Sequence, residues 1–418
     1  MARKTWYRID NVAKVFLASA NERDTRSFRI SCTLKEEVDP DLLNEALKMA
    51  ALDRPQYQVT ILRGYFWHYM ESTDDIPVAT EECDRPCPML IDYKTFGKLH
   101  YRVTYFNNRI NLDFSHVIAD GNGAIDFLNV IINRYLVLKY PDSFPDAPMF
   151  SGASEADRAQ DSFKHFHQKR KNFKRLLTQK KAYAIRGAKH PYNQTQFLEI
   201  HMPVKDVLAQ SKKLNVSLTS YMCSLLMMSI YKDMPAFKRK MPVAISLPVN
   251  LRNYYPSQTS RNFFNSINVS RIFKAEDTLE EVALKFNADL KEQLDPEIVA
   301  ERMDNFEKLE TNWFIRFVPL IFKNPVVNFV TRRNAKRVTA TYSNLGKLSL
   351  PDGVSDYIQS YAAFCSTSTL FIVCSTYKDE LVLGISSAYR NTQILKDFIK
   401  NFTDNEIPVT VYSNDIID

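Results

Sequence analysis

Residues 109–140 read R-I-N-L-D-F-S-H-V-I-A-D-G-N-G-A-I-D-F-L-N-V-I-I-N-R-Y-L-V-L-K-Y, and a change of periodicity inside this stretch predicts the fold. From Ile110 to Ser115 apolar and polar residues alternate, which is typical of a half-buried strand. His116 continues the apolar parity, so we expect its ring on the inward face at the end of that strand. Asp120–Gly123 predicts a tight turn, because two nearby glycines release the backbone from ordinary steric limits. Beyond this turn the apolar residues take helical spacing, at Phe127, Leu128, Ile131, Ile132, Tyr135 and Leu138.

A histidine in this position suits a general base. An imidazole titrates near neutral pH and can accept a proton from a hydroxyl or an amine. The Asp120 carboxylate, just beyond the bend, can fold back to hold the loop or the ring. From these residues alone, His116 as a hydrogen-bonded structural residue and Asp120-Gly121 as a plain turn stay open. The pair also suits two metal ligands, but no further ligand stands at a supporting spacing, so we expect no metal site.

The residues Ser115–Gly121, S-H-V-I-A-D-G, resemble the H-x-x-x-D-G signature of the chloramphenicol acetyltransferase-like acyltransferases. That superfamily includes alcohol acetyltransferases, wax-ester synthases and the condensation domains of peptide synthetases. The resemblance implies that His116 is the general base. It implies that Asp120, the other catalytic-motif residue, has a mainly structural role and pairs with an arginine. Condensation domains usually carry a second histidine where this chain has Ser115, and that departure favours the alcohol acetyltransferase branch.

A second block resembles the same superfamily, in the same order along the chain. A buried strand predicted at 243–249 ends near Arg252, and the aromatic, asparagine-rich block S-R-N-F-F-N-S follows at 260–266. By carry-over from the family, Arg252 is the expected partner of Asp120 and supports the loop that contains Gly121. A guanidinium can hold a carboxylate through two hydrogen bonds. Arg261 is the competing partner, and a surface charge after a strand is the alternative interpretation of Arg252.

The third matching segment is Thr341–Gly346, T-Y-S-N-L-G. Members of the superfamily often carry a similar S-N-x-G turn near the active-site channel. The resemblance implies that Ser343 and Asn344 bind substrate by donating hydrogen bonds to a carbonyl or a developing oxyanion, with backbone N–H groups near Gly121 as further donors. An ordinary Asn-x-Gly turn is the alternative.

The rest of the chain predicts alternating strands and helices in two halves. In the first half we expect a strand at 27–34, a helix from Pro40 to Ala51 capped by Asp39, and a hairpin that joins 98–107 to the strand at Ile110. In the second half we expect strands at 197–202, 243–249, 361–377 and 381–387. We expect helices at 204–214, 221–231, 279–294 and 393–402. The basic stretch from Lys164 to Arg186 is expected to be a solvated connection between the halves, with a phosphate-attracting patch as the alternative.

The segment from Trp313 to Val330 is rich in Phe, Val and Ile, is interrupted by Pro319 and Pro325, and precedes Arg332-Arg333. One interpretation is an interfacial membrane segment with a basic flank. The other is a pair of core helices joined at proline. We favour the core interpretation, and peripheral membrane contact stays open as the less favoured alternative.

Length and composition set the outer limits. A chain of 418 residues is longer than one core usually supports, and 45% hydrophobic with 25% charged residues is ordinary for a soluble globular protein. The net charge of +7 fits an anionic ligand such as a coenzyme A phosphate or an acidic carrier surface. We expect no nucleic-acid partner, because no recognisable motif is present and the basic residues are dispersed. The six cysteines do not form a recognisable disulfide framework.

The N-terminal segment lacks the apolar run of a signal peptide, and no run of apolar residues is long enough to span a membrane. We therefore expect a cytoplasmic protein.

Together these patterns predict an α/β (α+β) fold of two acetyltransferase-like subdomains, 1–185 with H-x-x-x-D-G and 195–418. Each is expected to be a mixed sheet flanked by helices, with a channel between them. The resemblance implies an acyltransferase that moves an acyl group from a thioester to a hydroxyl or amine acceptor. Acyl-CoA is the favoured co-substrate, because no carrier segment is recognisable in the chain, and no bound cofactor is expected. A stand-alone condensation-type enzyme using an acyl carrier protein, or a non-catalytic binding relative, is the alternative.

Overall fold

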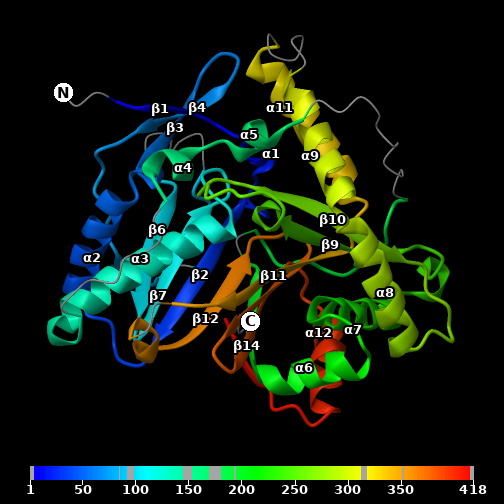
Figure 1. The fold of residues 1–418 in the computed structure, drawn as a ribbon. Helices are drawn as coiled ribbons and strands as arrows, with labels where there is room; N and C mark the ends of the chain where they lie inside the picture. The colour runs from blue at the N-terminus through cyan, green and yellow to red at the C-terminus, as the bar shows by residue number, and fades with distance from the viewer. Residues whose placement is uncertain are drawn as a thin grey trace.

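The computed structural model describes residues 4–83, 85–91, 98–144, 153–168, 180–192, 194–311, 318–350 and 353–414. The strands form two large mixed sheets and one small sheet, with helices on the outside of both large sheets (Figure 1). The predicted α/β fold with two sheet-containing halves is therefore confirmed. Residues 169–179 of the predicted basic stretch and residues 313–317 of the apolar segment lie outside the described residues.

The N-terminal sheet has five strands in the order β12-β2-β7-β6-β5. All neighbours are antiparallel except β5 and β6, which are parallel. Asn107, with a φ of +50°, makes the tight turn between β6 and β7 that the sequence predicts as a hairpin. The strand bounds are β2 Ser27–Leu34, β5 Thr80–Glu81, β6 Tyr101–Phe106, β7 Arg109–Ser115 and β12 Ile358–Cys365.

The C-terminal sheet has seven strands in the order β10-β9-β11-β13-β14-β8-β15. Strand β11 is parallel to both its neighbours, and the other pairs are antiparallel. The bounds are β8 Gln196–Pro203, β9 Val243–Asn250, β10 Phe264–Arg271, β11 Ala340–Leu348, β13 Leu370–Tyr377, β14 Glu380–Ser387 and β15 Thr410–Ser413. The small sheet, in the order β1-β4-β3, consists of β1 Trp6–Arg8, β3 Val59–Arg63 and β4 His68–Ser72.

Helices α2 and α3 pack together beside the N-terminal sheet, and α6, α7, α8 and α12 pack in the C-terminal half (Figure 1). The α2 helix begins after Asp39, whose side chain caps it as predicted. The bounds are α1 Asn11–Ser19, α2 Pro40–Asp53, α3 Gly121–Lys139, α4 Glu155–Ala159, α5 Ser162–Phe166, α6 Val204–Lys213, α7 Leu218–Asp233, α8 Leu279–Gln293, α9 Pro296–Thr311, α11 Leu320–Ala335 and α12 Gln393–Thr403. Short 3-10 turns are η1 Pro55–Tyr57, η2 Pro141–Ser143, η3 Ala236–Lys238, η4 Leu251–Asn253 and η5 Val354–Tyr357.

Strand β12 crosses from the C-terminal half and pairs with β2 at the edge of the N-terminal sheet (Figure 1). Its inward residues join the first apolar core, β13 contributes to both cores, and β14 contributes to the second. The two sheets meet here so closely that a Cβ on Gly384 would lie 1.8 Å from the carbonyl oxygen of Ala363. The division at 185 and 195 stays a prediction, and β12 is an exception to it in sheet membership.

The expectation that β7 is half buried is wrong, because its polar face is buried as well. Asp113 on that face has no solvent exposure and accepts hydrogen bonds from the guanidinium groups of Arg29 and Arg102 and from the backbone of Cys87. These partners lie on other segments of the chain. The alternation within β7 therefore could not show that its polar face is buried and hydrogen-bonded rather than exposed to solvent.

The predicted turn at Asp120–Gly123 is also corrected. Asp120 is the N-cap of α3, its side chain accepts a hydrogen bond from Gly123, and the helix begins at Gly121. The glycines are explained by close approach: a Cβ on Gly123 would lie 2.1 Å from the Ser260 carbonyl oxygen and 2.9 Å from the Tyr57 hydroxyl.

The core interpretation of the 313–330 segment is wrong for the described part. Helix α11 lies on the outer surface of the molecule, and Ile321, Phe322 and Phe329 are all about two-thirds exposed, at 66%, 64% and 65%. The helix contains Pro325, which removes one backbone donor without ending it.

In the described part of the chain, no single helix combines the length and apolar character needed to cross a bilayer. The pair α6 and α7 meets both criteria only when taken together, and it is bent by 82°.

Candidate active site

His116 follows β7 directly and lies where the two halves of the chain meet. Its ring is packed among three aromatic rings, with centroid distances of 4.3 Å to Phe28, 5.1 Å to Phe16 and 6.1 Å to Phe264. Phe28 belongs to β2 and Phe16 to α1, whereas Phe264 begins β10 of the C-terminal sheet. The side chain is largely enclosed but keeps partial solvent exposure. The ring therefore stands at the junction, as the sequence analysis expects.

The pKa of His116 is lowered to about 4, chiefly because burial penalises the charged imidazolium. The Asp120 carboxylate opposes this shift and the Arg26 guanidinium adds to it. Among the described residues no group forms a hydrogen bond with the enclosed Nδ1 atom. The Ala119 backbone and the Asn262 side chain also oppose the lowering of the pKa. The imidazole is consequently neutral at physiological pH, which is the protonation state that a general base requires.

Asp120 and Arg252 form the ion pair that the sequence analysis predicts. The Arg252 guanidinium donates to both carboxylate oxygens of Asp120, at 2.7 Å from Nη1 and 3.3 Å from Nη2. Asp120 is only 4% exposed, and it also accepts hydrogen bonds from the backbone of Gly123 and Phe263. The pair joins the start of α3 in the first half to the β9–β10 connection in the second.

Arg252 is itself held by the loop after β9. Its guanidinium donates to the carbonyl oxygens of Thr259 at 2.8 Å and Arg261 at 2.8 Å, so its charge is spread over one carboxylate and two backbone acceptors. Arg261, the competing candidate, points elsewhere: its guanidinium donates to the Arg8 carbonyl and lies 3.8 Å from the Asp10 carboxylate. The choice of partner for Asp120 thus falls to Arg252.

Asp10 and Asn262 belong to the surroundings of His116, and the sequence analysis did not single them out. The Asn262 side-chain amide donates to the backbone carbonyl of His116 at 2.8 Å and lies 3.3 Å from the Asp10 carboxylate. Asp10 is buried and caps α1, which presents Phe16 to the histidine ring. Burial raises the pKa of Asp10 to about 6, against the opposing effect of Arg261. The position of Asn262 within the aromatic block at 260–266 could have indicated that it lies near the site. For Asp10 the sequence indicates only a possible helix N-cap.

Gly121 lies at the same junction. A Cβ at this position would stand 3.2 Å from the side chain of Leu345, which comes from β11 of the other sheet. The predicted support of the motif loop therefore includes an apolar contact across the junction as well as the ion pair.

Ser343 and Asn344 lie in β11, not in the ordinary turn considered as an alternative. The strand carries a bulge between Asn344 and Lys347, and Gly346 in the bulge has a φ of +75°. The Asn344 side chain donates to the Thr219 hydroxyl at 3.1 Å and accepts from the Gly346 backbone at 2.8 Å. Both of these contacts lie within the C-terminal half, and it is Leu345 that this segment places against the motif glycine.

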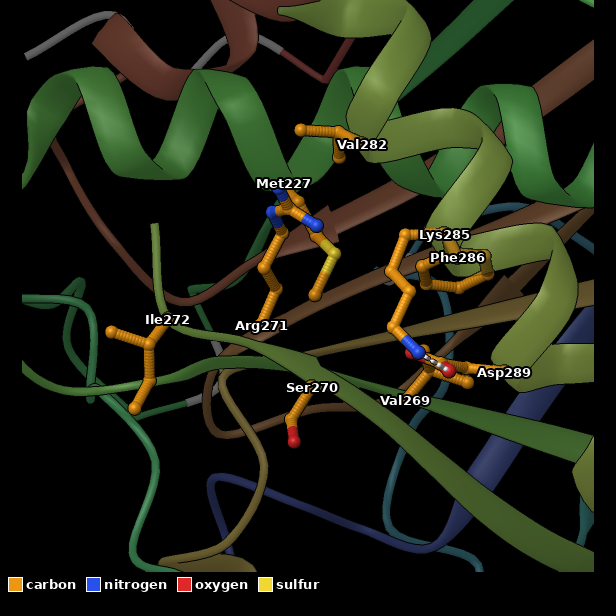
Figure 2. A pocket seen from close by; sticks show the side chains of 9 residues that line it. All are labelled: Met227, Val269, Ser270, Arg271, Ile272, Val282, Lys285, Phe286 and Asp289. Atoms are coloured by element: carbon orange, nitrogen blue, oxygen red, sulfur yellow. Dashed lines mark hydrogen bonds and ion pairs between the residues drawn. The ribbon is translucent and has the colours of Figure 1, made fainter. Parts of the chain in front are cut away.

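A separate pocket lies between α7, α8 and β10, away from His116 (Figure 2). Its cavity volume is about 220 Å³, below the ~300 Å³ at which small-molecule sites usually begin. The Lys285 ammonium at its rim is paired with Asp289 at 2.6 Å, and Arg271 is paired with Asp277 at 2.7 Å. Its cations are thus neutralised within the protein.

Among the described residues, no group of three or more His, Cys, Asp or Glu side chains is arranged to hold a metal ion.

The sequence matches no protein-family model and no curated protein. Several solved structures are similar over nearly the whole chain. The first condensation domain of the calcium-dependent antibiotic synthetase, solved with a substrate analogue, has a TM-score of 0.62 at 10% identity and covers 97% of this chain and 99% of its own. Trichothecene 15-O-acetyltransferase from Fusarium sporotrichioides has a TM-score of 0.61 at 12% identity, with 96% and 94% covered.

A third similar structure is TRI101 of the same fungus, solved with coenzyme A and T-2, with a TM-score of 0.61 at 12% identity and 96% and 99% covered. At these identities the likeness establishes the fold. The chain has the two-subdomain architecture shared by these condensation-domain and acetyltransferase structures.

Proposed function

We propose that the protein is an acyltransferase that moves an acyl group from a thioester to a hydroxyl or amine acceptor, with His116 as general base. The observation that carries this proposal is a neutral, largely enclosed imidazole at the junction of the two halves, on a loop locked by the Asp120–Arg252 pair. The shared fold supports it, because similar structures include an acetyltransferase and condensation domains.

The proposed reaction needs no covalent enzyme intermediate. His116 takes the proton of the acceptor as its oxygen or nitrogen attacks the thioester carbonyl, and a tetrahedral oxyanion forms. When the carbon–sulfur bond breaks, the imidazolium returns that proton to the departing thiolate. Preorganised donors would meet the oxyanion charge, and the N-terminal amides of α3 around Gly121 are the best placed by chain position. Ser343 and Asn344 remain proposed substrate contacts on the other side of the junction.

Coenzyme A is the proposed donor. Ser115 stands where condensation domains usually have a second histidine, and one similar structure was solved with coenzyme A. A carrier-protein thioester is the second candidate, because condensation domains match the fold equally well. Presenting one acyl group on coenzyme A and on a phosphopantetheinylated carrier protein separates the two: the true donor should have the higher kcat/KM.

The central experiment incubates the purified protein with a panel of acyl-CoAs and of alcohols or amines, and follows free thiol release. Cys83 is exposed, so a sample without acceptor corrects for its reaction with the thiol reagent. His116→Ala should lower kcat by about 10²–10⁴-fold with the fold intact. His165→Ala, an exposed histidine on α5, is the matched control and should keep the wild-type rate.

A His116→Ala protein with wild-type turnover would refute the base assignment. Saturable acyl-CoA binding without thiol release from any acceptor would instead identify a binding relative.

A further inference from the structure

Helix α11 lies at the upper right of the view in Figure 1, and its exposed side chains are large and apolar. Besides Ile321, Phe322 and Phe329, Val326 is 62% exposed and Val330 is 48% exposed. Isolated exposed apolar residues are normal on protein surfaces, but a continuous set of large ones marks a binding surface.

The exposed side chains share one side of the helix. Since successive residues turn by about 100°, the positions between Leu320 and Arg332 that fall on one half of the circumference are Ile321, Phe322, Pro325, Val326, Phe329 and Val330. No polar residue interrupts this set. The same half-circumference is then continued in and just beyond the last turn by Arg332, Arg333, Lys336 and Arg337. These ten positions are the α11 face, and it grades from apolar to cationic along the helix axis.

The opposite side of α11 fixes the helix to the protein. Leu320 and Lys323 are buried, and α1 packs against the helix. The Lys323 ammonium donates to the Phe66 carbonyl at 3.1 Å and lies 3.4 Å from the centre of the Trp67 ring. The apolar side is therefore held outward by specific contacts.

The turn between β3 and β4 extends the α11 face at its apolar end. The Leu320 backbone donates to the Tyr65 carbonyl at 3.0 Å, so the turn lies beside the first residue of the helix. Tyr65 is 73% exposed, and its ring packs edge-on against Phe66 at 4.9 Å. Aromatic side chains with a polar tip favour the boundary between hydrocarbon and water.

The segment of the chain that contains α11 carries charge of one sign. Residues 311–351 contain seven Lys and Arg and no Asp or Glu, a charge of +7. That equals the formal net charge of the whole chain, so the remaining residues sum to zero. The basic character of the protein is thus concentrated in the segment that contains α11.

We propose that the α11 face docks the protein on the surface of an anionic lipid bilayer. The apolar residues and the Tyr65–Phe66 turn enter the boundary between headgroups and acyl chains, while Arg332, Arg333 and their neighbours contact lipid phosphates. A protein partner would need an apolar surface to cover the exposed residues of α11 and acidic groups to face its cations. A bilayer supplies both, as acyl chains and as headgroup phosphates. This proposal does not depend on the proposed chemistry.

The test is flotation of the full-length protein with vesicles of phosphatidylcholine alone and with phosphatidylglycerol added. The wild type should bind the anionic vesicles, and high salt should weaken binding. Phe322→Ser with Phe329→Ser should reduce the bound fraction by at least about tenfold. Both side chains are about two-thirds exposed and contribute little packing within the protein. Arg332→Glu with Arg333→Glu should reduce the fraction bound to the anionic vesicles by at least about tenfold, with no such effect on phosphatidylcholine vesicles.

Matched controls make the same changes elsewhere. Leu52→Ser with Phe237→Ser removes two exposed apolar side chains, and Lys212→Glu with Lys213→Glu reverses two exposed cations on α6. All four double variants should keep wild-type thermal stability, and both controls should bind vesicles as the wild type does. The proposal is overturned if the wild type ignores anionic vesicles, or if controls and α11 variants bind alike. It is equally overturned if sedimentation finds a dimer that the Phe322/Phe329 variant dissolves while vesicles stay unbound.

Discussion

The ion pair between Asp120 and Arg252 can be tested quantitatively by removing each partner singly and together. In Arg252→Ala the Asp120 carboxylate stays buried and keeps the backbone donors of Gly123 and Phe263 but loses both guanidinium contacts. We expect unfolding to become easier by about 3 kcal/mol, at the lower end for an orphaned buried charge. In Asp120→Asn the arginine keeps the carbonyl oxygens of Thr259 and Arg261, so we expect about 2 kcal/mol.

The double variant Asp120→Asn, Arg252→Ala should cost less than the sum of the two, by about 1–2 kcal/mol of coupling. Urea unfolding, followed by tryptophan fluorescence, measures the free energies of unfolding. The rate of acyl transfer reports whether the motif loop is still in place. Because the pair holds the helix start next to His116, each single variant should also lower kcat/KM by about 10–100-fold. Arg252→Lys keeps the charge but loses the planar guanidinium, so its stability and kcat/KM should lie between those of the wild type and of Arg252→Ala. Single costs that add to within about 0.5 kcal/mol would refute the proposed linkage.

Three further outcomes follow from the same geometry. Gly123→Ala should destabilise the fold by about 1–3 kcal/mol in thermal unfolding, because its Cβ would meet the Ser260 carbonyl at 2.1 Å; an unchanged melting temperature contradicts the close approach. Since burial lowers the pKa of His116 to about 4, the acidic limb of kcat/KM should fall near that pH and not near the ordinary histidine value; a limb at about 6.5 would contradict a neutral buried base. The pKa of His201 is raised to about 9 because its protonated ring donates hydrogen bonds to the carboxylates of Glu199 and Glu380, although burial opposes the shift. Its stabilisation is complete below about pH 6.5 and is lost as pH rises through 9, by about 2 kcal/mol after solvent screening, and His201→Gln should abolish that pH dependence of unfolding.

The elements around the motif could be predicted because their signals are local. The alternation of β7, the helical spacing of α3 and the Asp39 cap of α2 depend on residues within a few positions of each other. The pairing of Asp120 with Arg252 is 132 residues apart and followed only from the family resemblance.

The environment of His116 could not be read from the sequence because it is assembled from distant segments. Phe16 and Phe264 come from segments far apart in the chain, and the Asn262 contact with Asp10 spans 252 residues. No periodicity links such positions. The prediction that the segment around α11 is part of the core was wrong for a different reason. Composition indicates an apolar surface but does not show whether the rest of the protein covers it.

The crossing strand β12 has a consequence for synthesis on the ribosome. Strand β2 gains its outer partner only when residues 358–365 have been made, long after the rest of its sheet. Until then one edge of β2, eight residues in which polar and apolar side chains alternate, has no partner strand, and such edges recruit strands from other chains. A nascent chain paused before that point should therefore need a holding chaperone, and a gene split into two separately expressed lobes should give an insoluble first product.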